Sequence, residues 1–273
     1  MRSTLWKKTV VCIAAMSMIA LAGCGSKENE SAEGDLLARI QEKGEIVVAM
    51  EGTWAPWTYH DENDKLVGFD VEVAENIASK LGVKATFVEG EWDGLLAGLE
   101  AGRYDCMVNG VDVTQERQQA YDFSEPYAFN RIALVVRSDN DSIKTFEDLA
   151  GKTTTNTISS TYAQLAEQYG ATVNGVDDLN QTIELVLAGR ADATLNSEVT
   201  IYDYLSEKPD AQLKIAALTE EATNVAIPMP KGTDTDSLRE AVNKAIRELR
   251  EEGVLAELSI KYFGTDITRE TVE

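Results

Sequence analysis

Two oppositely charged residues lie five positions apart in the segment 109–117, and their chemistry is complementary. The planar guanidinium of Arg117 can grip a carboxylate through two parallel hydrogen bonds. The carboxylate of Asp112 can hold an ammonium group, and Gly110 allows the backbone to approach a ligand closely. A free amino acid carries both a carboxylate and an ammonium group, so this segment could bind the two groups together. The alternatives are a surface position for Arg117 and a helix cap for Asp112.

Aromatic and hydroxyl residues supply further candidate contacts. Trp54, Trp57 and Tyr59 offer large contact areas at low entropic cost. We expect Trp54 to form a cavity wall, whereas Trp57 and Tyr59 could equally belong to the core. Ser159 and Ser160 open a predicted helix, whose N-terminus favours an anion. Plain helix capping is the alternative, and one serine could do both.

Alternating strands and helices must position these residues. Hydrophobic periodicity predicts strands at 45–50, 84–89, 104–108, 131–137, 191–195 and 225–229, and helices at 70–81, 92–101, 159–170, 180–188 and 238–252. Asp70 is the expected N-cap of the first of these helices. The alternation predicts an α/β fold with largely parallel sheets. The pattern alone leaves open whether the chain forms one sheet or two lobes.

The first residues of the chain have the pattern of a targeting segment. Arg2, Lys7 and Lys8 precede an uncharged apolar run at 9–20, which is short for a membrane span. The sequence LAGC at 21–24 resembles the lipobox of bacterial lipoproteins. We therefore expect a signal peptide at 1–23, lipidation of Cys24 and a flexible polar tether at 24–35.

Composition argues against several classes of function. The net charge is −22, so a nucleic-acid partner is not expected; the charge could favour solubility or steer a cationic ligand. His60 is the sole histidine, and Cys106 lies in an apolar run as a small core residue. We find no pattern of a catalytic triad or of metal ligands, and expect neither an enzyme nor a cofactor.

A series of motifs carries a resemblance to a known family. In chain order they are EGTWAPWTY at 51–59, GFDVE at 68–72, WDGL at 92–95, GRYD at 102–105, NGVDVTQER at 109–117, YDFS at 121–124 and KYFG at 261–264. Together they resemble the polar amino-acid-binding proteins of ABC importers, the family 3 solute-binding proteins. The resemblance runs from about residue 45 to residue 267.

This resemblance implies a two-lobed clamshell, the type II periplasmic-binding-protein fold, with two crossover strands at the hinge. Lobe 1 would comprise 36–134 plus 226–267, and lobe 2 would comprise 138–222. The hinge strands would be 132–136 and 223–227. Closure of the lobes around a ligand is the implied motion.

The resemblance also implies roles for individual residues. Arg117 would bind the ligand carboxylate, the Gly110 carbonyl would accept from its ammonium, and Trp54 would stack on it. Ser159, Ser160 and Thr161 open the helix at a point where relatives have Gly-Thr, whose backbone N–H groups contact the ligand carboxylate.

The ammonium partner differs from the pattern of the family. Many relatives hold the ammonium with an aspartate in lobe 2, where this chain has Ser197, and have Ser or Thr where it has Asp112. We hypothesise that Asp112 holds the ammonium and that Ser197 only accepts a hydrogen bond.

The implied function is amino-acid capture for a membrane permease. Glu51 occupies an acidic position common in cystine-binding relatives, so the candidate ligand is cystine or another polar amino acid. The protein would be a monomer, lipid-anchored on the extracytoplasmic face of the membrane. The alternatives are a dehydratase-like enzyme that uses Glu51 as a base, and a surface receptor or adhesin on the same scaffold.

Overall fold

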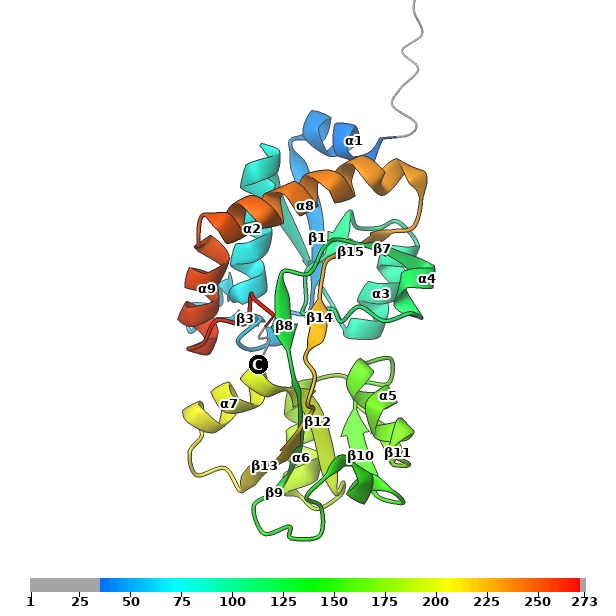
Figure 1. The fold of residues 1–273 in the computed structure, drawn as a ribbon, viewed down its shortest axis with the longest axis vertical. Coiled ribbons are helices and arrows are strands. Elements are labelled where there is room, and N and C mark those ends of the chain that lie inside the picture. Colours follow the sequence, from blue (N-terminus) through cyan, green and yellow to red (C-terminus); the bar gives the residue numbers. More distant parts are fainter. Residues whose placement is uncertain (1–34, 271–273) are drawn as a thin grey trace, which may run out of the picture. The chain divides into compact units, whose positions relative to one another are not determined.

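Figure 1 shows the computed structural model, which describes residues 35–270. The expected signal peptide, the expected lipidation site Cys24 and the expected tether up to residue 34 lie outside the described residues. Within residues 35–270, every helix is too short or too polar to cross a membrane.

A three-stranded parallel sheet forms the centre of the first lobe, in the upper half of Figure 1. Its order is β5 (Lys84–Glu89), β1 (Glu45–Met50), β6 (Cys106–Met107). Ile46, Val48 and Met50 pack in one core cluster, and Ala49 points to another. Because both faces of β1 are covered, its side chains are apolar on both sides, as in other buried parallel sheets.

Helices cover this sheet. They are α1 (Leu36–Lys43), α2 (Phe69–Leu81), α3 (Trp92–Glu100), α8 (Asp236–Glu251) and α9 (Val254–Phe263). Helix α8 buries Leu238, Val242, Ile246 and Leu249, which recur at helical spacing and form its apolar face. Helix α3 packs in the cluster that contains Ala49, whereas α2, α8 and α9 contribute to the larger cluster.

The prediction that Asp70 is the N-cap of α2 was wrong. Gly68 occupies that position, and Asp70 lies in the first turn of the helix. The Asp70 carboxylate accepts hydrogen bonds from the Gly110 N–H and from the Tyr127 hydroxyl, far away in sequence. A tertiary contact therefore takes the place of the local one that the sequence predicts.

A five-stranded mixed sheet forms the second lobe, in the lower half of Figure 1. Its order is β11 (Thr172–Gly175), β10 (Thr153–Asn156), β12 (Ala193–Ser197), β9 (Ile132–Arg137), β13 (Leu213–Leu218). Strand β9 runs antiparallel to β12 and β13, and the other pairs are parallel. The helical elements here are α5 (Thr161–Gln168), α6 (Leu179–Leu187), α7 (Glu198–Glu207) and the 3₁₀ turn η1 (Phe146–Leu149).

Two antiparallel strands connect the lobes, β8 (Ala128–Asn130) and β14 (Thr223–Val225). The first crossing thus precedes the expected segment 132–136, because that segment is β9 and pairs on both sides within the second sheet. The two-lobed α/β fold with two crossover strands is as expected, while the expected lobe boundaries stay a prediction.

Short elements complete the first lobe. They are β2 (Thr53–Trp54), β3 (Thr58–His60), β4 (Leu66–Val67), α4 (Arg117–Ala120), β7 (Tyr121–Phe123), β15 (Pro228–Pro230) and the 3₁₀ turn η2 (Thr233–Thr235). Strands β2, β3 and β4 form a small antiparallel sheet directly after β1, and this sheet carries Trp54.

Candidate ligand-binding site

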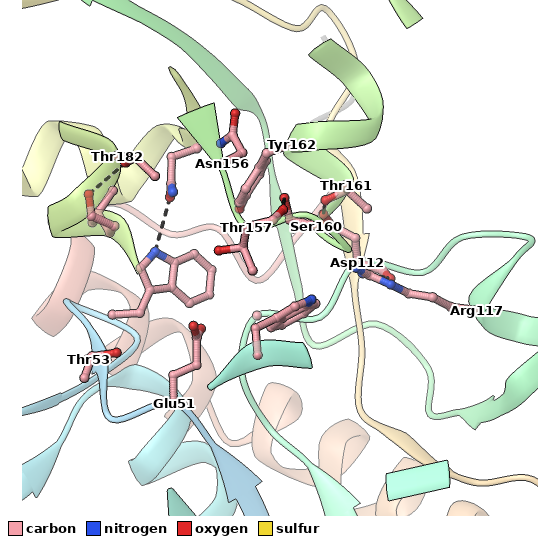
Figure 2. Close-up of a pocket in the computed structure, with 15 residues that line it drawn as sticks. Glu51, Thr53, Asp112, Arg117, Asn156, Thr157, Ser160, Thr161, Tyr162 and Thr182 are labelled. Atoms are coloured by element: carbon pink, nitrogen blue, oxygen red, sulfur yellow. Dashed lines mark hydrogen bonds between the residues drawn. The ribbon is translucent and has the colours of Figure 1, made fainter. Parts of the chain in front are cut away.

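A cavity between the lobes has an empty volume of about 580 Å³, part of which is open to solvent (Figure 2). Glu51 follows β1, Gly110 follows β6, Asn156 ends β10 and Asn196 lies near the end of β12. Ligands of α/β folds bind outside the carboxyl ends of the strands. The complete lining is Glu51, Thr53, Trp54, Trp92, Gly110, Asp112, Arg117, Asn156, Thr157, Ser160, Thr161, Tyr162, Leu179, Thr182 and Asn196.

Arg117 is the first residue of α4 and is buried. Its Nη1 donates to the Asp112 carbonyl at 3.0 Å, and its Nη2 donates to the Ser159 carbonyl at 3.2 Å. Its guanidinium carbon lies 5.0 Å from the centroid of the Trp92 ring, a cation–π distance. Burial lowers the pKa of Arg117, and the nearby Asp112 opposes this. Arg117 lines the cavity, and its guanidinium has N–H donors beyond the two in use.

Asp112 joins the two lobes. Its carboxylate accepts hydrogen bonds from the hydroxyl of Thr161, at the start of α5, and from that of Thr223 on β14, the latter at 2.6 Å. Burial raises the pKa of Asp112, while both hydroxyls and Arg117 lower it. Its carboxylate caps no described helix, so the capping alternative does not account for its position.

Glu51 lies on the opposite side of the cavity from Asp112 and Arg117 in Figure 2. One of its carboxylate oxygens accepts from Asn109 Nδ2 at 2.7 Å. Burial, together with the charges of Asp178 and Asp93, raises the pKa of Glu51 to about 7, and the hydrogen bond from Asn109 opposes this. The described residues give Glu51 no ion-pair partner. This side of the cavity consequently favours a cationic group.

Trp54 forms a wall of the cavity and stacks on Trp57, with ring centroids 5.3 Å apart. The Trp54 indole N–H donates to Asn196 Oδ1 at 3.2 Å, across the lobes. Gly110 lies beneath this ring with φ +55°, and a Cβ there would lie 2.5 Å from Trp54 Cζ3. Glycine is therefore required both by the backbone conformation and by the ring.

Three residues that the sequence suggested for ligand contact do not line the cavity. Trp57 is completely buried behind Trp54, and its indole N–H donates to Thr200 Oγ1 at 3.1 Å. The hydroxyl of Ser159 contacts Asp93. Ser197 is also completely buried, and donates to Asn130 Oδ1 at 2.9 Å.

Ser160 caps its helix and also lies at the cavity. It lines the cavity, and its Oγ accepts from the Ala163 N–H at 3.1 Å as the N-cap of α5. The neighbouring Thr161 is the first residue of that helix and makes the contact with Asp112.

Sequence reasoning missed several lining residues, chiefly Trp92, Asn156, Tyr162, Thr182 and Asn196. In the described part of the chain, Trp92 Nε1 and Asn156 Oδ1 are buried without a hydrogen-bond partner. Such groups are costly unless a ligand or water completes them. A usable signal was present for Asn196, a polar residue that directly follows the predicted strand 191–195.

Comparison with known proteins decides the family. A model of the bacterial extracellular solute-binding proteins, family 3, matches residues 46–265. The chain belongs to this family. As a family 3 solute-binding protein it is a binding component and not an enzyme, as expected. Within residues 35–270 no cluster of His, Cys, Asp and Glu is arranged to hold a metal ion.

Relatives of this family 3 protein include the L-cystine-binding protein TcyA of Bacillus subtilis, which is 39% identical over 93% of this chain and 96% of its own length. An ancestral arginine-binding protein bound to arginine is 36% identical with a TM-score of 0.76, covering 81% of this chain and 99% of that one. The L-cystine solute receptor of Neisseria gonorrhoeae, in an unliganded open conformation, is 41% identical with a TM-score of 0.59, covering 87% and 100%.

The TM-scores of the arginine-binding protein and the L-cystine receptor differ, although the two proteins are similarly identical to this chain in sequence. The ligand-bound relative superposes better than the open one. The better match to a ligand-bound relative agrees with the direct hydrogen bonds between the lobes of this chain, from Trp54 to Asn196 and from Thr161 to Asp112.

Proposed function

We propose that this chain is the amino-acid-binding component of an ABC importer, and that its cavity holds a polar amino acid, with cystine as the candidate. The observation that carries the proposal is the charge arrangement of one cavity: a buried guanidinium on one side and carboxylates beside it and opposite it. The name of the relative TcyA supports both the class and the candidate.

The α-amino and α-carboxyl groups of the ligand would bind beside Arg117. The guanidinium grips the carboxylate, and the N-terminus of α5 at Ser160 adds a favourable dipole. Asp112 and the Gly110 carbonyl hold the ammonium. The Trp54 ring packs against the rest of the ligand. Each of these residues lines the cavity.

Glu51 supports cystine over an amino acid with a short or acidic side chain. Cystine has two amino-acid ends, so one carboxylate can meet Arg117 while the far ammonium meets Glu51. An ammonium there would neutralise the negative charge of Glu51, which is unfavourable because the side chain is buried and has two acidic neighbours. A glutamate side chain in the same place would be repelled.

A thermal-shift screen of the amino acids and cystine tests the function. A ligand that binds only the folded chain at 100 times its Kd adds about 2.7 kcal/mol to the free energy of unfolding. Calorimetry with cystine should then give a signal that disappears when a reductant converts cystine to cysteine. Arginine is the control ligand, because a reductant does not alter it. A screen without any hit contradicts the proposed function, and a signal insensitive to reductant contradicts cystine.

Three substitutions test the roles of the lining residues. Arg117→Lys should weaken binding at least tenfold, because an ammonium cannot make the bidentate contact. Asp112→Asn and Glu51→Gln should each weaken binding of cystine. Arg247→Lys is the matched control, because Arg247 is an exposed residue paired with Glu125, away from the cavity. Unchanged affinity in Asp112→Asn would rule out its contact with the ammonium.

The same proposal includes membrane attachment through Cys24 and delivery to a permease. The resemblance of residues 21–24 to a lipobox supports it. Metabolic labelling with a fatty acid should mark the wild-type chain and not Cys24→Ser. Labelling of both would contradict lipidation at this residue.

A further inference from the structure

Asp70 is a charged residue in a place that a structural role alone does not explain. Its side chain has no exposed surface. Its two oxygens accept from the Gly110 N–H at 2.6 Å and from the Tyr127 hydroxyl at 2.7 Å. It forms no ion pair with any residue of the range 35–270. A buried carboxylate without a cation is costly, and an amide could satisfy two such partners without that cost.

The two contacts of Asp70 lead to the cavity and to the hinge. Gly110 lines the cavity beneath Trp54. Tyr127 directly precedes the crossover strand β8, and its N–H donates to the carbonyl of Val225 on the other crossover strand, at 2.9 Å. Asp70 therefore accepts hydrogen bonds both from Gly110, at the floor of the cavity, and from Tyr127, at the start of the hinge.

The same segment continues to the second lobe. Asp112 pairs with Val225 in an isolated bridge, and its carboxylate contacts Thr223 and Thr161. A shift of Gly110 would move Asp112 as well, since only one residue separates them. The position of Gly110 thus bears on both the ligand contacts and the contacts between the lobes.

We propose that Asp70 is a positioning residue for ligand capture, which fixes Gly110 against the core and places a negative charge behind the part of the cavity that receives the ammonium. This inference rests on the proposed function. The charge lies within the low-dielectric core, where it acts on the ammonium more strongly than it would in water. The uncompensated carboxylate lowers stability, and its retention at a functional site is a known trade-off.

The substitution Asp70→Asn tests the inference. Asparagine keeps the size, can accept from Gly110 and can donate to the Tyr127 oxygen, but removes the charge. At pH 8 its thermal midpoint should equal or exceed that of the wild type, while its affinity for the amino acid found in the screen should be at least tenfold weaker. A purely structural role predicts the reverse, a lower midpoint with unchanged affinity.

The effect on affinity should depend on pH. Burial raises the pKa of Asp70 to about 7, with the Tyr127 and Gly110 hydrogen bonds opposing it. At pH 5 Asp70 is protonated in the ligand-free wild type, so the difference in affinity from Asp70→Asn should shrink. Glu51 also has a pKa of about 7 and Asp112 a raised one, but both are present in the two proteins compared.

Glu72→Gln is the matched control. Glu72 lies on the same helix, and its carboxylate also accepts from a tyrosine hydroxyl, that of Tyr262 at 2.5 Å. It is paired with Lys261 and lies outside the cavity lining. This control should keep the wild-type affinity at both pH values.

Tyr127→Phe provides an independent measurement, because it keeps the charge and removes one contact of Asp70. Its affinity should fall about threefold or more, whereas Tyr262→Phe should leave affinity unchanged. If both Asp70→Asn and Tyr127→Phe bind with wild-type affinity, the inference about Asp70 is overturned and the proposed function is unaffected. A wild-type chain that binds no amino acid overturns the proposed function and the inference together.

Discussion

Replacing Gly110 by alanine should damage both stability and ligand binding through one added carbon. The new Cβ would lie 2.5 Å from Trp54 Cζ3 and 2.7 Å from Trp54 Cη2, well inside van der Waals contact. The residue also has φ +55°, a conformation that alanine adopts only at a cost. The ring must therefore move, and it forms the wall of the cavity.

The magnitude follows from the contacts that Trp54 would lose. The left-handed backbone costs ~1–2 kcal/mol for a residue with a Cβ. Loss of the stacking on Trp57 costs ~1 kcal/mol, and loss of the hydrogen bond to Asn196 costs ~1 kcal/mol. The free energy of unfolding should fall by ~3 to 4 kcal/mol in total, and ligand affinity should fall at least tenfold.

Urea denaturation and calorimetry measure the two effects, and Gly44→Ala is the control. Gly44 has φ +75° and nothing within 4 Å of an added Cβ, so it reports the backbone cost alone. Its substitution should cost ~1–2 kcal/mol and leave affinity unchanged. If the two variants lose equal stability and bind ligand equally well, the argument from the Trp54 contact is wrong.

Three further predictions concern buried groups. The free energy of unfolding should fall as the pH rises from about 4 to about 7, because the raised pKa of Asp70 keeps a proton on the folded chain that the unfolded chain loses. For Asp70 alone the fall is ~4 kcal/mol; urea titrations across this range measure it, and a flat profile would contradict it. Trp54→Phe removes the N–H that binds Asn196 and should weaken ligand affinity about fivefold in calorimetry; wild-type affinity would show that this contact is dispensable. In a chain with Cys12 and Cys24 changed to serine, Cys106 should react with a thiol reagent only in denaturant, because burial raises its pKa; rapid reaction under native conditions would refute its burial.

Local patterns predicted many of the helices and strands, although not β10, β11 or β13, and much of the first lobe's contribution to the cavity. The spacing of Leu238, Val242 and Leu249 identified α8, since an apolar face at helical period needs no distant information. Arg117 and Asp112 were proposed because their charges complement those of an amino acid and because residues 109–117 resemble a motif of the family. The structure places both in the cavity lining.

The residues that were predicted wrongly or missed are those whose contacts are with residues distant in sequence. Asp70 looked like a helix cap because its partners Gly110 and Tyr127 are distant in sequence. Whether Trp57 lines the cavity or belongs to the core also depended on tertiary structure, because only the fold decides which ring of the stacked pair faces the cavity. Most of the second lobe's contribution, including Asn156, was missed for the same reason.

The two crossover strands make one lobe a nested insertion within the other. The core of the outer lobe joins Val48 and Ile77, from early in the chain, to Val242 and Leu255 near its end, whereas the inner lobe draws its sheet entirely from 132–218. During synthesis the inner lobe can therefore complete its sheet while the outer one still lacks α8 and α9. A chain stopped short of these helices would lack Val242 and Leu255 and would expose the apolar residues of the outer lobe that pack against them, although the strands of the inner sheet would all be present.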